Sequence, residues 1–331
     1  MRTQPTHCGA AALLVMLGAA CNSSETAAGD RTSVSTAAVA AATATATVTT
    51  TKPTSSSATA AAPASAAATT AAGATSEPAF EPFDAGSFDP ARSAIIDNAW
   101  YPLLAGTRWT YEGSALDQGE KVSRHLEFTV TSLTKEIAGV RTAVAYIVDT
   151  DDGVVVEKEI AFYAQDKKGN VWYFGEHPEE YDNGRFVEAP TWIAGYADAK
   201  PGIKMRPEPS LGSPSYYQGW GPAVDWTDYA RIDQVGTKTC VPLGCYENVT
   251  VIAESSLAER GIFQVKDYAR GVGELRVGWR GPDPSEEQLE LVAFSKLDDA
   301  AVARARADAL DLEKHAYVVS KNLYGRTAPA R

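Results

Sequence analysis

Apolar and polar residues alternate with a period of two through much of this chain. Residues 107–113 (TRWTYEG) place Trp109 and Tyr111 on one face, and residues 125–133 repeat the pattern. Successive side chains of a strand point to opposite faces, so such runs predict β-strands. Asp and Gly at 149–153 predict a hairpin turn between two of them. Further runs of this kind cover residues 144–148, 154–162, 171–176, 185–188, 226–239, 246–253, 262–268, 274–279 and 288–294.

Two stretches depart from this alternation. Residues 189–221 hold several prolines among aromatic residues, which predicts a long ordered loop packed by its own rings. After Asp298, a suitable N-cap, an Ala-rich stretch predicts a helix to about Leu323 that packs on the sheet or docks a partner. The predicted fold class is mainly β: an antiparallel curved sheet, half-barrel or sandwich with a C-terminal α-helix, preceded by a disordered linker.

The first residues have the composition of an export signal. Arg2 precedes an apolar stretch at residues 9–20, which has the length of a signal-peptide core and is too short to span a bilayer. Cys21 follows three small residues, and this arrangement resembles a bacterial lipobox, in which the cysteine is acylated. Leu17 lies one position further from Cys21 than a lipobox usually places it. Ordinary secretory cleavage after Ala20 is therefore the alternative, and both routes predict export.

The next segment is rich in Ala, Thr and Ser and precedes the first aromatic residue, Phe80. Such a segment buries too little apolar surface to offset its ordering entropy, which predicts a disordered tether. An acylated Cys21 would anchor the tether to a membrane of the bacterial envelope, on its periplasmic or extracellular face. The predicted organisation is a signal peptide (1–20), a tether (21–78), an antiparallel β domain (79–297) and a C-terminal helix with a tail (298–331).

The charge balance excludes a class of partner. The chain has 42 Asp and Glu against 30 Lys and Arg, a formal net charge of −12. Residues 1–78 hold equal numbers of acidic and basic side chains, so the whole excess belongs to residues 79–331. Phosphate backbones require clustered Lys and Arg, and we therefore expect no nucleic-acid partner.

Four segments resemble a group of uncharacterised bacterial secreted proteins and lipoproteins. They are residues 102–113 (PLLAGTRWTYEG), 162–176 (FYAQDKKGNVWYFGE), 201–205 (PGIKM) and 268–275 (YARGVGEL). The likeness spans about residues 98–295, and its most specific part is 162–176. The resemblance implies an all-β exported domain and brings no assigned activity. Relatives have a Pro-x-Gly turn without cysteines where this chain has Cys240 and Cys245.

Cys240 and Cys245 flank four residues that include Pro242 and Gly244. Exported proteins meet an oxidising compartment, and this spacing can bring two Cα atoms within disulfide range. We therefore predict a local disulfide. A zinc site would need two further ligands, and redox activity is typical of the shorter Cys-x-x-Cys spacing.

No familiar catalytic motif occurs, and we predict no catalytic residue, no metal and no cofactor. The densest polar cluster is residues 176–182 (EHPEEYD). Its carboxylates, between Glu176 and Asp182, could serve a polysaccharide hydrolase or lyase, or bind Ca²⁺. A solvated loop between two strands is the interpretation that we favour.

Aromatic residues crowd the centre of the predicted β domain. Exposed rings could stack on sugars, and rings lining a concave sheet could enclose a lipid tail or another apolar molecule. The same rings could instead form the core. The leading hypothesis is a non-enzymatic binding domain for a lipid or other apolar molecule; the alternatives are the polysaccharide-active enzyme and a structural or partner-binding envelope protein. The candidate ligand contacts are Trp172, Trp192, Tyr216, Tyr217, Trp220 and Trp226.

Overall fold

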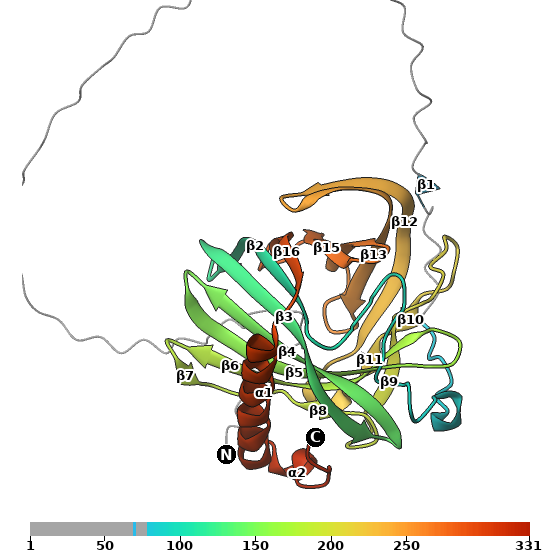
Figure 1. The fold of residues 1–331 in the computed structure, drawn as a ribbon. Coiled ribbons are helices and arrows are strands. Elements are labelled where there is room, and N and C mark those ends of the chain that lie inside the picture. Colours follow the sequence, from blue (N-terminus) through green and yellow to red (C-terminus); the bar gives the residue numbers. More distant parts are fainter. Residues whose placement is uncertain (1–68, 71–77) are drawn as a thin grey trace, which may run out of the picture. The chain divides into compact units, whose positions relative to one another are not determined.

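Antiparallel strands form one sheet that bends into a nearly closed barrel (Figure 1). The computed structural model describes residues 69–70 and 78–331. The strands are β1 (Thr69–Thr70), β2 (Thr107–Asp117), β3 (Glu120–Ile137), β4 (Val140–Asp151), β5 (Val154–Gln165), β6 (Val171–Asp182), β7 (Arg185–Phe186), β8 (Trp192–Ile193), β9 (Lys200–Met205), β10 (Tyr216–Tyr217), β11 (Gly219–Trp220), β12 (Asp228–Val241), β13 (Gly244–Ser256), β14 (Phe263–Ala269), β15 (Gly273–Arg280) and β16 (Gln288–Lys296). The helices are the 3-10 turns η1 (Ala85–Ser87) and η2 (Pro222–Val224) and the α-helices α1 (Asp299–Val319) and α2 (Lys321–Tyr324).

The strands follow the order β12-β13-β14-β15-β16-β2-β3-β4-β5-β6-β9 around the barrel. Most neighbours are joined by hairpins, but β16 pairs with β2 and so joins the two ends of the domain. The short segment 216–220 closes the barrel. Its first part, β10, pairs with β12, and its second part, β11, pairs with β9. The predicted fold class, mainly β with a C-terminal helix, is confirmed.

Two-residue turns set the register of the hairpins. Between β4 and β5, Asp152 and Gly153 have φ angles of 49° and 81°, and Ala138 and Gly139 between β3 and β4 have 50° and 78°. Positive φ at both positions marks a type I′ turn, whose twist matches that of paired strands. Glycine adopts this conformation without steric cost. The turn predicted at residues 149–153 is therefore confirmed.

The stretch 189–221 differs from its prediction. We expected a long loop, and the structure instead contains four short strands there, β8 to β11. Strand β9 pairs with β6, and Pro201 lies near its start, where a missing N–H removes few hydrogen bonds between strands. The prolines therefore shorten these strands without preventing them.

Helix α1 lies on the outer surface of β3, β4 and β5 (Figure 1). The Asp298 side chain caps it, accepting a hydrogen bond from the N–H of Ala301 at 2.7 Å. Its buried face includes Ala305, Ala309 and Leu312. The expected packing of this helix on its own sheet is thus observed, and it covers strand faces that would otherwise be exposed to water.

The C-terminal segment ends on the sheet. Helix α1 stops at Val319, and Ser320 leads into α2, so the predicted single helix to Leu323 is broken near its end. The backbone N–H and C=O of Arg331 pair with those of Thr134 at 2.9 and 3.0 Å. Among the helices of residues 78–331, none is long and apolar enough to cross a membrane.

The predictions for the N-terminal region concern residues that are almost all outside the described part of the chain. These are the signal peptide 1–20, Cys21 and most of the tether 21–78. The exception is β1, which pairs with Val235 and Gln234 of β12. In the described part, Cys240 and Cys245 lie opposite each other in the β12–β13 hairpin and form the predicted disulfide.

Candidate functional site

The inner face of the barrel is polar along β5. Side chains alternate on this strand, so Glu157, Glu159 and Tyr163 point inward while Ile160 and Phe162 point outward toward the C-terminal helices. Both faces are buried: Glu157 and Glu159 are each 4% exposed, and Phe162 is fully buried. The helices on the outside therefore allow the apolar face of β5 to lie outside and its acidic face to lie inside.

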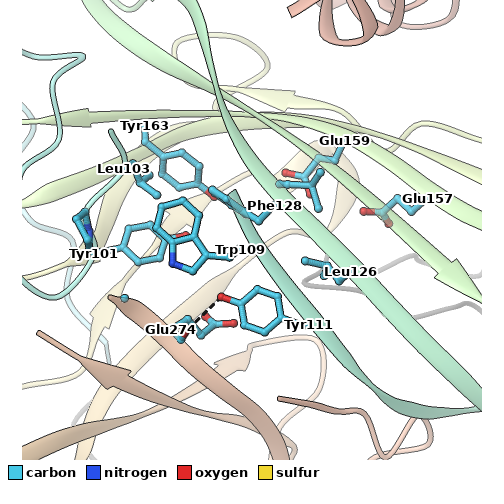
Figure 2. A pocket seen from close by; sticks show the side chains of 13 residues that line it. Tyr101, Leu103, Trp109, Tyr111, Leu126, Phe128, Glu157, Glu159, Tyr163 and Glu274 are labelled. Carbon is cyan, nitrogen blue, oxygen red and sulfur yellow. Dashed lines mark hydrogen bonds between the residues drawn. The ribbon is translucent and has the colours of Figure 1, made fainter. Parts of the chain in front are cut away.

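A cavity of about 40 Å³ lies within the barrel between β2, β3, β4, β5 and β15 (Figure 2). It has room for about three water molecules. Its apolar part is formed by Tyr101, Pro102, Leu103, Trp109, Tyr111, Leu126, Phe128 and Ile147. Its polar part is formed by Glu157, Glu159, Tyr163 and Glu274.

Hydrogen bonds and ring contacts fix the cavity wall. The Trp109 indole N–H donates to the carbonyl of Val272 at 2.7 Å, and the Tyr111 hydroxyl donates to the carbonyl of Glu274 at 3.1 Å (Figure 2). The Trp109 ring meets Phe128 edge-on with centroids 5.7 Å apart. These contacts connect β2 to β3 and β15, so the wall is organised without a ligand.

Carboxyl groups outnumber cations on the inner face. Arg124 contacts Asp151 at 2.7 Å and Glu287 at 3.0 Å. Glu254 lies between Lys204 at 2.9 Å and Lys266 at 2.7 Å, and these lysines lower the pKa of Glu254 to about 2 despite its burial. The buried inward carboxyls are Asp149, Asp151, Glu157, Glu159, Glu176, Glu254, Glu274 and Glu287, and the buried inward cations are Arg124, Lys204 and Lys266.

Four of these carboxyls form no ion pair within residues 78–331: Glu157, Glu159, Glu176 and Glu274. Burial raises the pKa of Glu159 to about 7. Burial and the neighbouring charge of Glu159 raise the pKa values of Glu157 and Glu176 well above the usual range. Three of the four, all except Glu176, line the cavity.

The six aromatic residues predicted as ligand contacts fall into separate clusters. Trp172 packs against Phe83 and Phe88 and donates its indole N–H to Asp166 at 2.9 Å. Trp192 and Trp226 lie 4.6 Å apart.

The remaining three belong to the segment 216–220 that closes the barrel. Tyr216 stacks on the Arg206 guanidinium, Tyr217 stacks on Phe80, and Trp220 meets Tyr217 edge-on. None of the six lines the cavity between β2, β3, β4, β5 and β15, which is built from other aromatic residues.

The cluster at residues 176–182 is not a solvated loop, because it forms the second half of β6. Alternation divides its side chains between the two faces. Glu176 points inward, accepting hydrogen bonds from Tyr173 and from the Trp192 indole. His177 and Glu179 point outward, where Glu179 contacts His177 at 3.0 Å and His315 of α1 at 2.7 Å. Residues that are close together in the sequence are therefore divided between the inside of the barrel and its outer surface.

A second, larger hollow of about 680 Å³ lies at the surface near the β3–β4 turn and the C-terminus. Its charged lining residues, Glu136, Arg141 and Arg331, are all exposed. No buried charge is directed into this hollow by the residues that the structure describes. In the same part of the chain, no group of three or more His, Cys, Asp or Glu residues is placed to hold a metal ion.

Two solved structures are similar to part of this chain. One is a candidate exported protein with a YmcC-like fold from Bacteroides fragilis, with 13% identity and a TM-score of 0.34. The other is a candidate lipoprotein from Parabacteroides distasonis, with 13% identity and a TM-score of 0.33. Each match covers 60% of this chain and 100% of the other. No protein-family model and no curated protein sequence matches the chain.

The carboxyls of β5 were not among the residues predicted to form a site. The signal was present in residues 154–163, where Glu157 and Glu159 fall on one face of the strand and Ile160 and Phe162 on the other. In an antiparallel sheet with one wet face, such acids would point to solvent. Finding them inside required knowing that α1 covers the opposite face.

Proposed function

We propose that residues 79–331 form a binding domain that takes a small molecule with an apolar part into the barrel. The cavity with an aromatic wall and a carboxyl end carries this proposal. Binding sites usually combine apolar walls with a few polar groups that fix the orientation of a ligand. A cavity of about 40 Å³ is too small for a lipid tail. The size of the cavity therefore excludes lipids from the predicted ligands and leaves small molecules with an apolar part.

The polysaccharide-active enzyme has less support from the geometry. That chemistry uses two carboxyls flanking a bond inside an open cleft. The Tyr173 hydroxyl bonds both Glu159 and Glu176, so these two carboxyls share a single neutral donor. Glu176 is buried and does not line the cavity, and Glu179 lies on the outer face.

An NMR screen of the isotope-labelled chain tests the binding function. The probes are a library of charged and uncharged molecules of up to about four non-hydrogen atoms, close to the cavity size. The Trp109 indole N–H reports binding, since its ring forms the cavity wall. We expect several probes to shift this resonance, and Leu126→Trp, which fills the cavity, to abolish those shifts. Leu243→Trp, at an exposed position in the β12–β13 turn, is the matched control.

A library in which no molecule moves the Trp109 resonance contradicts the binding function. Shifts that persist unchanged in the Leu126→Trp variant also contradict it, because they would arise outside the cavity. Folding of both variants is verified from the dispersion of their amide resonances.

We further propose that the chain is exported and anchored to the envelope by a lipid on Cys21. The small residues before Cys21 and the apolar stretch at 9–20 support this. In a bacterial host, Cys21→Ser should move the protein from the membrane fraction to the soluble fraction. Cys8→Ser, within the predicted signal peptide, is the matched control and should leave the protein in the membrane fraction. A wild-type protein that fractionates as soluble would contradict the anchor.

A further inference from the structure

Three carboxyl groups line the cavity, and none of them forms a direct ion pair within residues 78–331. Glu274 accepts a hydrogen bond from Tyr268 at 2.9 Å, and Glu159 accepts one from Tyr173 at 3.2 Å. Glu157 accepts no side-chain hydrogen bond and forms no ion pair within residues 78–331, although it is 4% exposed. Burying a carboxyl without a partner costs free energy. Because Glu157 lines a cavity, the missing partner is expected to be a group of a bound ligand.

The aromatic wall restricts the chemistry of that group. Trp109, Tyr111 and Phe128 form part of the apolar wall; Glu157 and Glu159 of β5 lie on one side of the cavity, and Glu274 lies beside Tyr111 (Figure 2). Ring faces attract organic cations, and rings also contact alkyl groups. A divalent metal ion would instead require oxygen ligands on most sides. An anion would meet three carboxyls in a buried site.

We propose that the cavity binds a protonated alkylamine, with its ammonium group at Glu157 and Glu159 and its alkyl group against Trp109 and Phe128. This inference rests on the proposed binding function and adds the charge of the ligand. The ammonium group has three N–H donors and no acceptor, so it can donate to both carboxyls. Its positive charge compensates the excess of acids on the inner face.

Binding is coupled to the protonation of the site. Glu157 faces Glu159 on its own strand, Asp149 on β4, and Glu176 and Glu180 on β6. The nearest inward cation on the β3 side is Arg124, which already pairs with Asp151 and Glu287. Across the barrel, Lys204 and Lys266 pair with Glu254, and their charges also act to lower the pKa of Glu159 against the larger effect of burial. Glu274 accepts a hydrogen bond from Tyr268.

Protons and ammonium ions therefore compete for Glu157 and Glu159, whose pKa values are raised by burial. At low pH the carboxyls are neutral, and an alkylammonium ion gains little from them. As the pH rises, the carboxyls lose their protons while the amine, with a pKa near that of lysine, stays charged up to about pH 9. The affinity for the amine should increase between about pH 5 and 8, whereas the affinity for an uncharged ligand should not.

The test compares three probes of nearly equal size: propylamine, 1-propanol and propionate. Each is titrated into the isotope-labelled full chain at pH 7.5, and the Trp109 indole resonance is followed. We expect propylamine to bind at least tenfold more tightly than 1-propanol, and propionate to cause no shift. Glu157→Gln should weaken propylamine at least tenfold and leave 1-propanol unchanged. The matched control is Glu112→Gln, a carboxyl on the outer face of β2.

The outcomes separate this inference from the binding function on which it rests. Equal affinity for 1-propanol and propylamine overturns the cationic ligand and leaves a binding cavity. Propylamine that shifts Trp109 equally in wild type and in a folded Glu157→Gln variant also overturns it. If Glu157→Gln does not fold, the wild-type ratio of amine to alcohol affinity decides alone. If the Trp109 resonance responds to none of the three probes, the amine site is wrong, and only the wider library then tests the binding function.

Discussion

Charged side chains are buried in two regions of this molecule, beneath helix α1 and inside the barrel. Beneath the helix they are paired: Lys135 contacts Glu313 at 2.7 Å, and Glu179 lies between His177 and His315. Inside the barrel, acids exceed cations. Burial of charge alone therefore does not indicate a site. A compensated charge belongs to the architecture, and an uncompensated charge beside a cavity indicates function.

The largest change in stability is expected for the paired charges beneath helix α1. The Lys135 ammonium group donates to Glu313 at 2.7 Å and to the carbonyl of Ala328 at 2.6 Å. Lys135→Met keeps a similar stem but leaves Glu313 buried without its cation. We expect a loss of about 3–5 kcal/mol in the free energy of unfolding, measured by urea denaturation. The double variant Lys135→Met/Glu313→Leu should recover most of this, and a single-variant loss below about 1 kcal/mol would contradict the pairing.

Inside the barrel, we expect a smaller effect on the free energy of unfolding, and one that depends on pH. Burial raises the pKa of Glu159 from its ordinary value of 4.5 to about 7. The folded state therefore binds this proton more tightly than the unfolded state, and stability is lost as the pH rises from about 5 through 7. The difference between the two pKa values corresponds to a loss of about 3 kcal/mol in the free energy of unfolding.

The Glu159→Gln variant removes the titrating group. Its free energy of unfolding should fall less between pH 5 and 8 than that of the wild type, measured by chemical denaturation at each pH. Glu112→Gln, on the outer face, should follow the wild-type curve. An unchanged pH dependence in Glu159→Gln would place the uncompensated charge elsewhere.

The smallest effect concerns a neutral contact beside the helix. The hydroxyls of Ser320 and Thr191 lie 2.8 Å apart, and Thr191 also contacts His177 at 2.6 Å. Ser320→Ala removes one hydrogen bond and should cost about 1 kcal/mol in thermal or chemical unfolding. The exposed Ser295→Ala serves as a control and should change stability by less than about 0.5 kcal/mol. A loss well above about 2 kcal/mol would show that this contact supports the charged cluster behind it.

Short-range sequence patterns predicted the strands, the C-terminal helix and the disulfide. Alternation identified the faces of strands such as β2, and Asp298 identified the start of α1. The spacing of Cys240 and Cys245 identified the disulfide. Each of these depends on residues close in the chain, where strand alternation, helix capping and short-range geometry determine the outcome.

The site depends on distant residues, and the sequence did not reveal it. Glu157 and Glu274 meet at one cavity only because β16 pairs with β2 and places β15 opposite β5. The inward direction of Glu157 follows from the helix on the far side of its strand. The aromatic residues predicted as ligand contacts, such as Trp172, fall into separate clusters, and most of their rings belong to the core. Composition cannot distinguish a ring in a core from a ring in a cavity wall.

The pairing of β16 with β2 also sets the order in which the chain can mature. Strand β2 begins at Thr107, but its partner β16 begins only at Gln288, and the helix that covers β3 to β5 comes later still. Nearly the whole polypeptide must be available before the barrel can close. Contacts between residues so far apart form slowly, because a long loop must be ordered first. A nascent chain with this topology stays open until its last segment arrives, which is the condition that a protein threaded unfolded through a membrane channel has to meet.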